Sequence, residues 1–321
     1  MAMEDPELCF PLLLNSSCVK PQSHTLETVT VYAVLSVVSL LTAILNLPVI
    51  ISIVYFRKLH SPTNLILLSL AVSDFFIGLV VLPVEIFMWN SCWLLGDLLC
   101  FLYFLLPITL LMTSITSMVF ISVDRYVAIC DPMHYHTRMT MKRVSITICI
   151  CWIYSIDYAL AVLYENYNNL GKYKYCQGEC VVNLAGIMDL VMGYFLPIST
   201  IVVLYMRVFV VAVFQARAMR CQVAIVTLHT KSKKSEIKAG RNLGILVLVF
   251  LMCYSPYYIA LTGQSNLLGT SFEVVLIFVM YVNSCINPIM YAMFYPWFRK
   301  TTKIIITLQI FTPGARDLNV D

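Results

Sequence analysis

Long apolar runs alternate with short polar segments along the whole chain. A membrane-spanning helix needs about 20 mostly apolar residues. Seven stretches meet this requirement, and we predict a helix in each: Val29–Phe56, Pro62–Met88, Leu98–Ile129, Val144–Tyr164, Val181–Phe214, Ile237–Leu261 and Phe272–Tyr295. The two-residue alternation of barrel strands is missing. Because a membrane-spanning backbone must satisfy its own hydrogen bonds, we expect an all-α membrane protein, a bundle of seven transmembrane helices.

After the seventh stretch, aromatic, basic and aliphatic residues are interleaved. The sequence Pro296-Trp297-Phe298-Arg299-Lys300 is followed by three isoleucines, Ile304 to Ile306. This mixture predicts a short amphipathic eighth helix on the inner leaflet. We expect a single domain over residues 1–321, with an extracellular segment 1–28, a helical bundle 29–295, and an amphipathic helix and cytoplasmic tail 296–321.

Charge gives the orientation of the bundle. The chain is 60% hydrophobic and 12% charged, with a net charge of +4. Most basic residues flank the predicted spans on one side, whereas the other side has only Lys20, Lys172 and Lys174. Since basic loops stay in the cytoplasm, we predict an extracellular amino terminus. The basic residues follow the spans, so we expect a lipid bilayer and no nucleic acid as partner.

Two features lie on the predicted outside. The sequon at Asn15 is a glycosylation acceptor, unless it is one of the many chance matches to this short pattern. Six of the twelve cysteines are also there and allow three disulfides in many connectivities: Cys9, Cys18, Cys92, Cys100, Cys176 and Cys180.

One acid lies deep inside the fifth apolar stretch. Asp189 is eight residues before Pro197, and a carboxylate at membrane depth usually marks a binding or ion site. An ammonium group there would form a charge-assisted hydrogen bond. Two alternatives remain: Asp189 pairs with Lys172 or Lys174, or it is protonated and faces a neighbouring helix.

Two further acids lie in the outer halves of spans. If Glu85 or Asp157 faces the same cavity as Asp189, a second ammonium group is held there and the ligand is a diamine or polyamine. The alternative is that these acids face a wet vestibule or pair with loops.

Short motifs carry a family resemblance. Asp124-Arg125-Tyr126 closes the third span, and Asn287-Pro288-Ile289-Met290-Tyr291 lies late in the seventh. With Asn46, Asp74, Trp152, Pro197 and Pro256 in the expected spans, the chain resembles the rhodopsin-like G protein-coupled receptors. The run from Asn283 to Tyr291, the motif Tyr295–Phe298 and the outer cysteine pattern resemble the trace amine-associated receptors within that family.

The resemblance implies a function. It implies an amine receptor of the plasma membrane, not an enzyme, that raises cAMP through a stimulatory G protein and acts in olfaction, with olfactory cilia as one location. Most such receptors carry an aspartate where this chain has Pro107. A subset, best known in fishes, carries it at the position of Asp189, and the chain resembles that subset. The alternative, an internal biogenic-amine receptor, is disfavoured by the missing acid.

The resemblance also implies roles for individual residues at the outer end. It pairs Cys100 with Cys180, Cys9 with Cys176 and Cys18 with Cys92, which would fix a lid over the pocket. The ligand pocket would be formed by Asp189 with these residues: Tyr257, Tyr258, Tyr281, Ile108, Leu111 and Tyr254. Tyr254 replaces the usual tryptophan of the sixth span.

The inner half has two further expected groups. A switch would combine an Arg125–Glu236 lock with these residues: Asp124, Tyr205, Tyr291, Ile115, Pro197 and Phe250. Simple core packing, or an ordinary surface ion pair, is the alternative. An allosteric sodium ion, or else a water network, would occupy an oxygen-rich cluster: Asp74, Ser114, Asn283, Ser284 and Asn287.

Overall fold

The computed structural model describes residues 7–13, 15–20, 26–88, 91–184, 186–222, 244–245, 247–260, 271–312 and 314–318. Within these ranges the chain is almost entirely helical, and β structure is limited to two isolated bridges. Six helices are long and apolar enough to cross a membrane, and a shorter apolar helix, Val247–Ala260, lies in the sixth predicted span. The predicted seven-helix bundle is confirmed.

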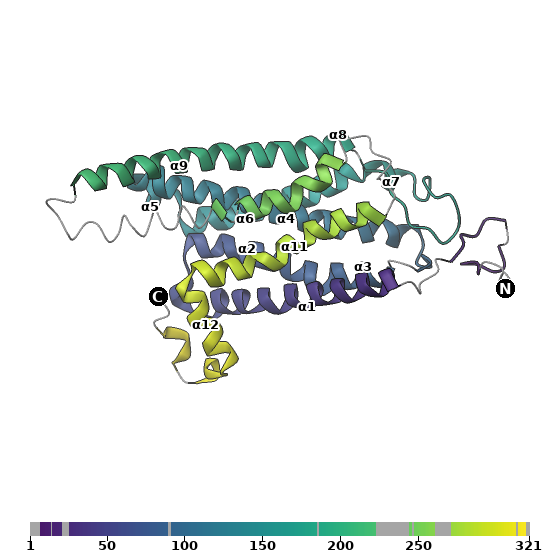
Figure 1. Cartoon of the computed structure of the whole chain (residues 1–321), viewed down its shortest axis with the longest axis horizontal. Helices are drawn as coiled ribbons and strands as arrows, with labels where there is room; N and C mark the ends of the chain where they lie inside the picture. The colour runs from purple at the N-terminus through teal and green to yellow at the C-terminus, as the bar shows by residue number, and fades with distance from the viewer. Residues whose placement is uncertain are drawn as a thin grey trace.

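The helices lie side by side, with the chain termini at opposite ends of the bundle (Figure 1). The bundle consists of α1 (Leu26–Tyr55), α2 (Pro62–Phe76) continued by η2 (Ile77–Val81) and α3 (Leu82–Met88), α4 (Asp97–Cys130), α6 (Met141–Val162), α8 (Gly186–Met188) continued by η4 (Asp189–Phe195) and α9 (Leu196–Gln222), helix Val247–Ala260, and α11 (Ser271–Phe294). The connections contain η1 (Arg57–Leu59), η3 (Pro132–His134), α5 (Tyr135–Arg138) and α7 (Tyr164–Asn168).

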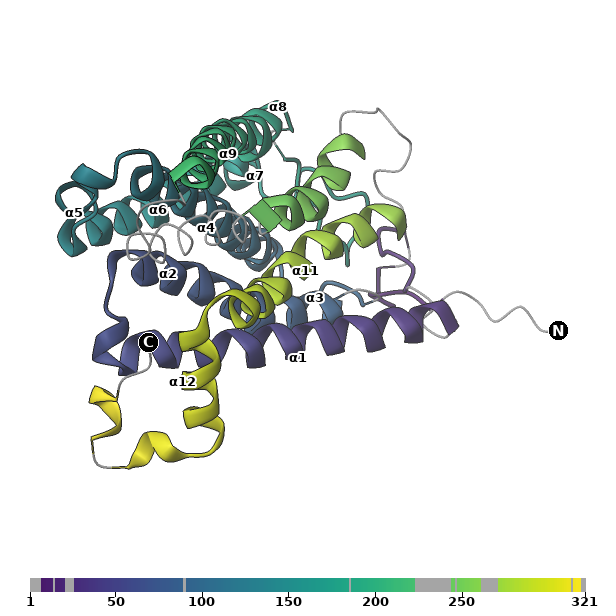
Figure 2. The ribbon, with the colours of Figure 1, turned by 60° about the vertical axis from the view of Figure 1, so that its left-hand side comes forward.

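The predicted eighth helix is α12 (Pro296–Ile306), which turns away from the bundle axis (Figure 2). Trp297 and Phe298 are buried, whereas Ile306 is exposed. The hydroxyl of Ser52 on α1 donates a hydrogen bond of 2.8 Å to Thr301. The chain then forms η5 (Gln309–Phe311) and η6 (Ala315–Asp317). We call this end of the bundle the tail end.

The outer faces of the helices are apolar, unlike those of a water-soluble protein. Large apolar side chains such as Leu40 and Phe209 are exposed on the outer faces of the helices, whereas Asn46, Asp74 and Asn287 are fully buried. This arrangement places apolar groups against lipid and polar groups against one another. It is the arrangement of a multi-pass membrane protein.

Two spans depart from regular α-helix. Both η2 and η4 are π-helical, with wider turns than an α-helix, and such segments often occur at functional sites. The fifth span begins at Gly186 and not at Val181, because the residues just after Cys180 are non-helical. By contrast, α4 continues through Pro107 without interruption.

Three disulfides tie the chain together at the end opposite α12. They link Cys9 to Cys92, Cys18 to Cys176 and Cys100 to Cys180. We call the segments 7–13, 15–20 and 169–184 the lid, and this end of the bundle the lid end. The Cys100–Cys180 pairing agrees with the expectation, but the expected Cys9–Cys176 and Cys18–Cys92 pairings are wrong.

Backbone pairing within the lid explains the difference. Ser17 forms a parallel bridge with Gln177, and the Cys18 amide donates a 2.8 Å hydrogen bond to the Gln177 carbonyl, so Cys18 lies beside Cys176. The Trp93 amide donates to the Gly178 carbonyl, and Cys9 packs against Gly178, so Cys9 reaches Cys92. Asn15 is exposed on the lid.

Candidate ligand-binding site

A cavity of about 140 Å³ lies inside the lid-end half of the bundle. Apolar and aromatic side chains form most of its wall, as in small-molecule sites generally. The predicted ligand residues Asp189, Tyr257, Tyr258, Tyr281, Ile108 and Leu111 all line it, as does Pro107. The fold therefore brings residues that are far apart along the chain to one cavity.

The Asp189 carboxylate is contacted from two other helices. Asp189 begins η4, and its Oδ1 accepts a short hydrogen bond from the Tyr158 hydroxyl of α6. The Tyr258 hydroxyl, from the helix Val247–Ala260, lies 3.4 Å from the same oxygen. Oδ2 has no hydrogen-bond donor within the described part of the chain, which leaves it available to a ligand.

Neither loop lysine pairs with Asp189. Lys172 Nζ lies 2.9 Å from Glu165, and Lys174 forms an ion pair with Asp97. The hydroxyl of Tyr173 and the ammonium of Lys172 lower the pKa of Glu165 by hydrogen bonding. No lysine, arginine or histidine among the described residues lines the cavity, so Asp189 has no cationic partner there.

Gly193, one turn after Asp189, makes room for this arrangement. A Cβ atom at Gly193 would lie 2.5 Å from the Tyr158 hydroxyl and 2.8 Å from Asp189 Oδ1. Neither Gly193 nor Tyr158 was recognised from the sequence as part of the site. The available signal was a glycine inside an apolar helix four residues after the acid, because such a glycine often marks a close approach of another group.

Of the two candidates for a second acid, only Glu85 lines the cavity. Glu85 on α3 lines the cavity and accepts a 2.6 Å hydrogen bond from the Tyr103 hydroxyl. Asp157 is exposed on α6 and does not line the cavity, so of the two alternatives left open for this acid the structure agrees with the one outside the pocket. Consecutive helical residues point about 100° apart, and the inward position is taken by Tyr158.

Stacked aromatic side chains extend from the cavity wall into the core along the sixth span. The rings of Tyr194 and Tyr258 stack with centroids 4.5 Å apart, and those of Phe250 and Tyr254 stack at 4.4 Å. Phe250 and Tyr254 are each only 1% exposed, and Ile115 and Pro197 are also buried. Tyr254 does not line the cavity itself; it connects the pocket wall to the core through Phe250.

A buried polar cluster surrounds Asp74 near the middle of the bundle. Asp74 accepts hydrogen bonds from Ser114 (3.0 Å) and from the Asn287 amide (2.8 Å). Both amide atoms of Asn283 and the hydroxyl of Ser284 are buried without a partner among the described residues. Buried polar atoms of this kind are usually satisfied by water or an ion, so the cluster suits either occupant.

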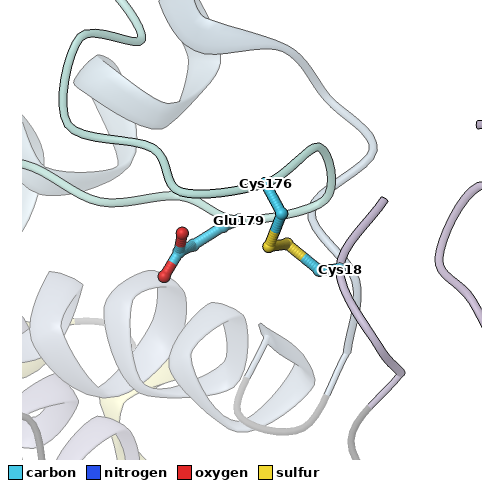
Figure 3. Close-up of side chains that lie close together, drawn as sticks. All are labelled: Cys18, Cys176 and Glu179. Atoms are coloured by element: carbon cyan, nitrogen blue, oxygen red, sulfur yellow. A yellow bond between two sulfur atoms is a disulfide. The ribbon is translucent and has the colours of Figure 1, made fainter. Parts of the chain in front are cut away.

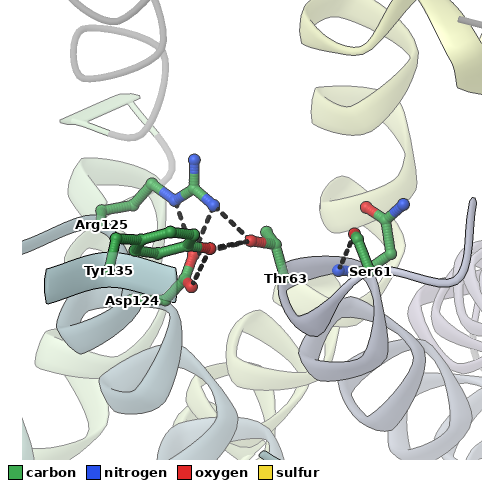
Figure 4. A network of polar contacts seen from close by, with 6 residues as sticks. Ser61, Thr63, Asp124, Arg125 and Tyr135 are labelled. Carbon is green, nitrogen blue, oxygen red and sulfur yellow. Dashed lines mark hydrogen bonds and ion pairs between the residues drawn. The ribbon is translucent and has the colours of Figure 1, made fainter. Parts of the chain in front are cut away.

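At the tail end, Arg125 is held by neighbours (Figure 4). Its Nε donates to Asp124 at 2.9 Å and its Nη2 donates to the Thr63 hydroxyl at 2.7 Å. Thr63 and Tyr135 each donate to Asp124 at 3.0 Å. The expected partner Glu236 lies outside the described residues.

Two tyrosines of the expected switch, Tyr205 and Tyr291, form no hydrogen bond with each other. Tyr205 packs its hydroxyl against Gly244. The Tyr291 hydroxyl is buried and has no hydrogen-bond partner within the described ranges.

Comparison with known proteins shows the family to which this chain belongs. The model of the rhodopsin-family seven-transmembrane receptors matches residues 45–291. Trace amine-associated receptor 13c of Danio rerio is 36% identical over 98% of this chain and 97% of its own length. Trace amine-associated receptor 4 of Mus musculus is 35% identical over 95% and 92%, and receptor 1 of Homo sapiens is 32% identical over 93% and 94%.

The chain belongs to the trace amine-associated receptors of the rhodopsin family. It is therefore a multi-pass G protein-coupled receptor, of a family whose members are receptors and not enzymes. Family membership implies an amine-type ligand and a G protein partner.

Proposed function

We propose that this trace amine-associated receptor binds the ammonium group of its ligand at Asp189. The supporting observation is a carboxylate with a free oxygen in a cavity that contains no basic residue among those described. Pro107 of α4 lines the same cavity and has no group that binds an amine. These features favour the fish-type subset, in which the binding acid is on the fifth helix and none is on the third.

The cavity supplies contacts for both ends of an amine. An ammonium group at Asp189 Oδ2 forms a charge-assisted hydrogen bond. The rings of Tyr257, Tyr258 and Tyr281 each contribute roughly 0.5–2 kcal/mol of cation–π attraction where they face it. Ile108 and Leu111 cover the carbon chain of the ligand.

The same contacts provide a route for activation. A ligand that contacts Tyr258 displaces the sixth helix, to which the Tyr254–Phe250 stack also belongs. Outward movement of that helix at the tail end opens a groove for a stimulatory G protein, which raises cAMP. Arg125, held by Asp124 of its own helix and by Thr63 of α2, lies at this end of the bundle. In this proposal the lid end is extracellular, Asn15 is glycosylated, the receptor serves olfaction and the Asp74 cluster holds sodium.

The test is a cAMP response to a panel of monoamines, diamines and polyamines in cells expressing the receptor. We expect Asp189→Asn to reach the cell surface and to lose at least about tenfold in potency, because about 1.4 kcal/mol of charge-assisted binding corresponds to that factor. Asp157→Asn is the matched control, since it removes an exposed acid one helix away. Normal responses by Asp189→Asn would overturn the proposed site.

A second candidate ligand class is the diamines. Glu85 and Asp189 line one cavity, and an acid pair without a basic partner is best neutralised by two positive charges. For such a ligand, Glu85→Gln reduces the response to diamines about tenfold more than the response to monoamines of equal chain length. An equal effect on both would leave Glu85 as a structural partner of Tyr103 only.

A further inference from the structure

The hydroxyl of Tyr158 lies beside the Asp189 carboxylate, and both residues line the same cavity. A phenol hydroxyl has one proton to donate and two lone pairs that accept. Its proton is used in the short hydrogen bond to Asp189 Oδ1, so the hydroxyl can offer a ligand only an acceptor oxygen. Asp189 Oδ2 and the Tyr158 oxygen therefore form a pair of acceptors for one positively charged group.

Neighbouring residues hold the Tyr158 hydroxyl in place. Tyr158 is only 5% exposed, and a Cβ atom at Gly193 would lie 2.5 Å from its hydroxyl. The Tyr258 hydroxyl is farther from the carboxylate, at 3.4 Å from Oδ1, and its ring stacks on Tyr194. Tyr158 is therefore the hydroxyl that lies closest to the binding acid.

Glu179, an acid of the lid, has different surroundings (Figure 3). It lies beside the Cys18–Cys176 disulfide and accepts a 3.1 Å hydrogen bond from the Tyr175 backbone amide. The two sulfur atoms are bonded to each other and are not thiolates, so these three side chains are not a metal site. Glu179 does not line the cavity that contains Asp189, so it adds no acceptor there.

We propose that Tyr158 is a specificity-determining residue, whose hydroxyl oxygen accepts a second hydrogen bond from the ammonium group bound at Asp189. A primary or secondary ammonium group has at least two N–H donors and satisfies both acceptors. A tertiary ammonium group has one N–H donor and leaves one buried acceptor unpaired, which costs binding free energy. The site therefore selects amines that carry at least two protons on the charged nitrogen. This inference rests on the proposed role of Asp189 and names the class of amine.

The test compares two isomeric amines that differ in the number of N–H donors. N-ethylbutylamine and N,N-dimethylbutylamine have the same composition and charge, but their ammonium forms carry two and one N–H groups. Their binding to purified full-length receptor in lipid nanodiscs is measured by isothermal titration calorimetry. We expect the parent to bind N-ethylbutylamine about tenfold more tightly, which is the factor for one hydrogen bond to a charged donor. In Tyr158→Phe, which keeps the ring and removes the acceptor, the preference falls to about twofold or less.

Tyr154→Phe is the matched control. Tyr154 precedes Tyr158 by one turn of α6, its ring centroid is 6.4 Å from that of Tyr158, and it does not line the cavity. We expect this variant to keep the preference of the parent. A Tyr158 that only orients the carboxylate would give a different result, because its loss would weaken the binding of both isomers by the same factor.

The outcomes separate this inference from the proposed function. No binding of N-ethylbutylamine by the parent, no preference in the parent, or a preference that persists in Tyr158→Phe would overturn the role of Tyr158. Unchanged binding of both amines by Asp189→Asn would instead overturn the binding acid itself. Correct folding of each variant is checked by its monodisperse elution and its thermal unfolding temperature.

Discussion

Gly193 leaves the space in which the hydroxyls of Tyr158 and Tyr258 reach Asp189. Replacing it with alanine places a methyl group 2.5 Å from one hydroxyl and 3.1 Å from the other, so both tyrosines must move. We expect Gly193→Ala to lower amine potency about tenfold, equivalent to about 1.4 kcal/mol, in a cAMP dose–response measurement.

A control for this substitution lies in the same span. A Cβ at Gly186 meets no atom within 4 Å, so Gly186→Ala adds the same methyl group without a clash. Equal potency for the two variants would show that space at Gly193 is not required for the site.

Asp189 could be predicted from the sequence as the acid of the site, but the side chains that hydrogen-bond to it could not. The order of residues alone shows an acid inside an apolar span, and an acid at membrane depth requires a polar or cationic partner. Tyr158 was not recognisable, because the direction of a side chain depends on how α6 is rotated against its neighbours. The same rotation places the adjacent Asp157 on the exposed face.

At the scale of elements, α2 and α4 are linked at the tail end through Thr63. Its hydroxyl accepts from Arg125 and donates to Asp124, so it stabilises Arg125 in its present position. Thr63→Val keeps the shape of the side chain and removes both hydrogen bonds. We expect a rise of about two- to fivefold in agonist-free cAMP, since each lost hydrogen bond contributes about 0.5–1.5 kcal/mol.

Thr137→Val provides the comparison for Thr63→Val. Thr137 is exposed in α5, and its hydroxyl donates to the His134 carbonyl one turn earlier. An agonist-free signal that is unchanged or lower in Thr63→Val, relative to Thr137→Val at equal surface expression, would contradict a restraining role for Thr63.

The positions of the membrane-spanning helices could be predicted from the sequence. The pairing of the cysteines and the π-helical segments could not. Apolar runs of about 20 residues specify spans because lipid leaves few alternatives. The π-helical segment from Asp189 to Phe195 is as apolar as the α-helical parts of the spans, so hydropathy does not distinguish the two helix types. The pairing of Cys9 and Cys18 depends on backbone contacts within the lid, which the order of cysteines in the chain does not determine.

Across the whole molecule, the two ends of the bundle use charge differently. At the lid end the lysines are paired and the cavity acids are not, which suits a cationic ligand. At the tail end Arg125 is held by Asp124 and Thr63. The Asp74 cluster and the Tyr254–Phe250 stack lie between these ends. A partly polar core therefore lies between the cation site and the restrained arginine.

The central claim is that Asp189 binds the positive charge of the ligand. The most direct measurement compares the binding of an activating amine with that of its isosteric alcohol, in the parent receptor and in Asp189→Asn. We expect a preference for the amine of about 100-fold or more in the parent, which falls to about tenfold or less in the variant. An undiminished preference in Asp189→Asn would contradict the account, because the charge would then be held elsewhere.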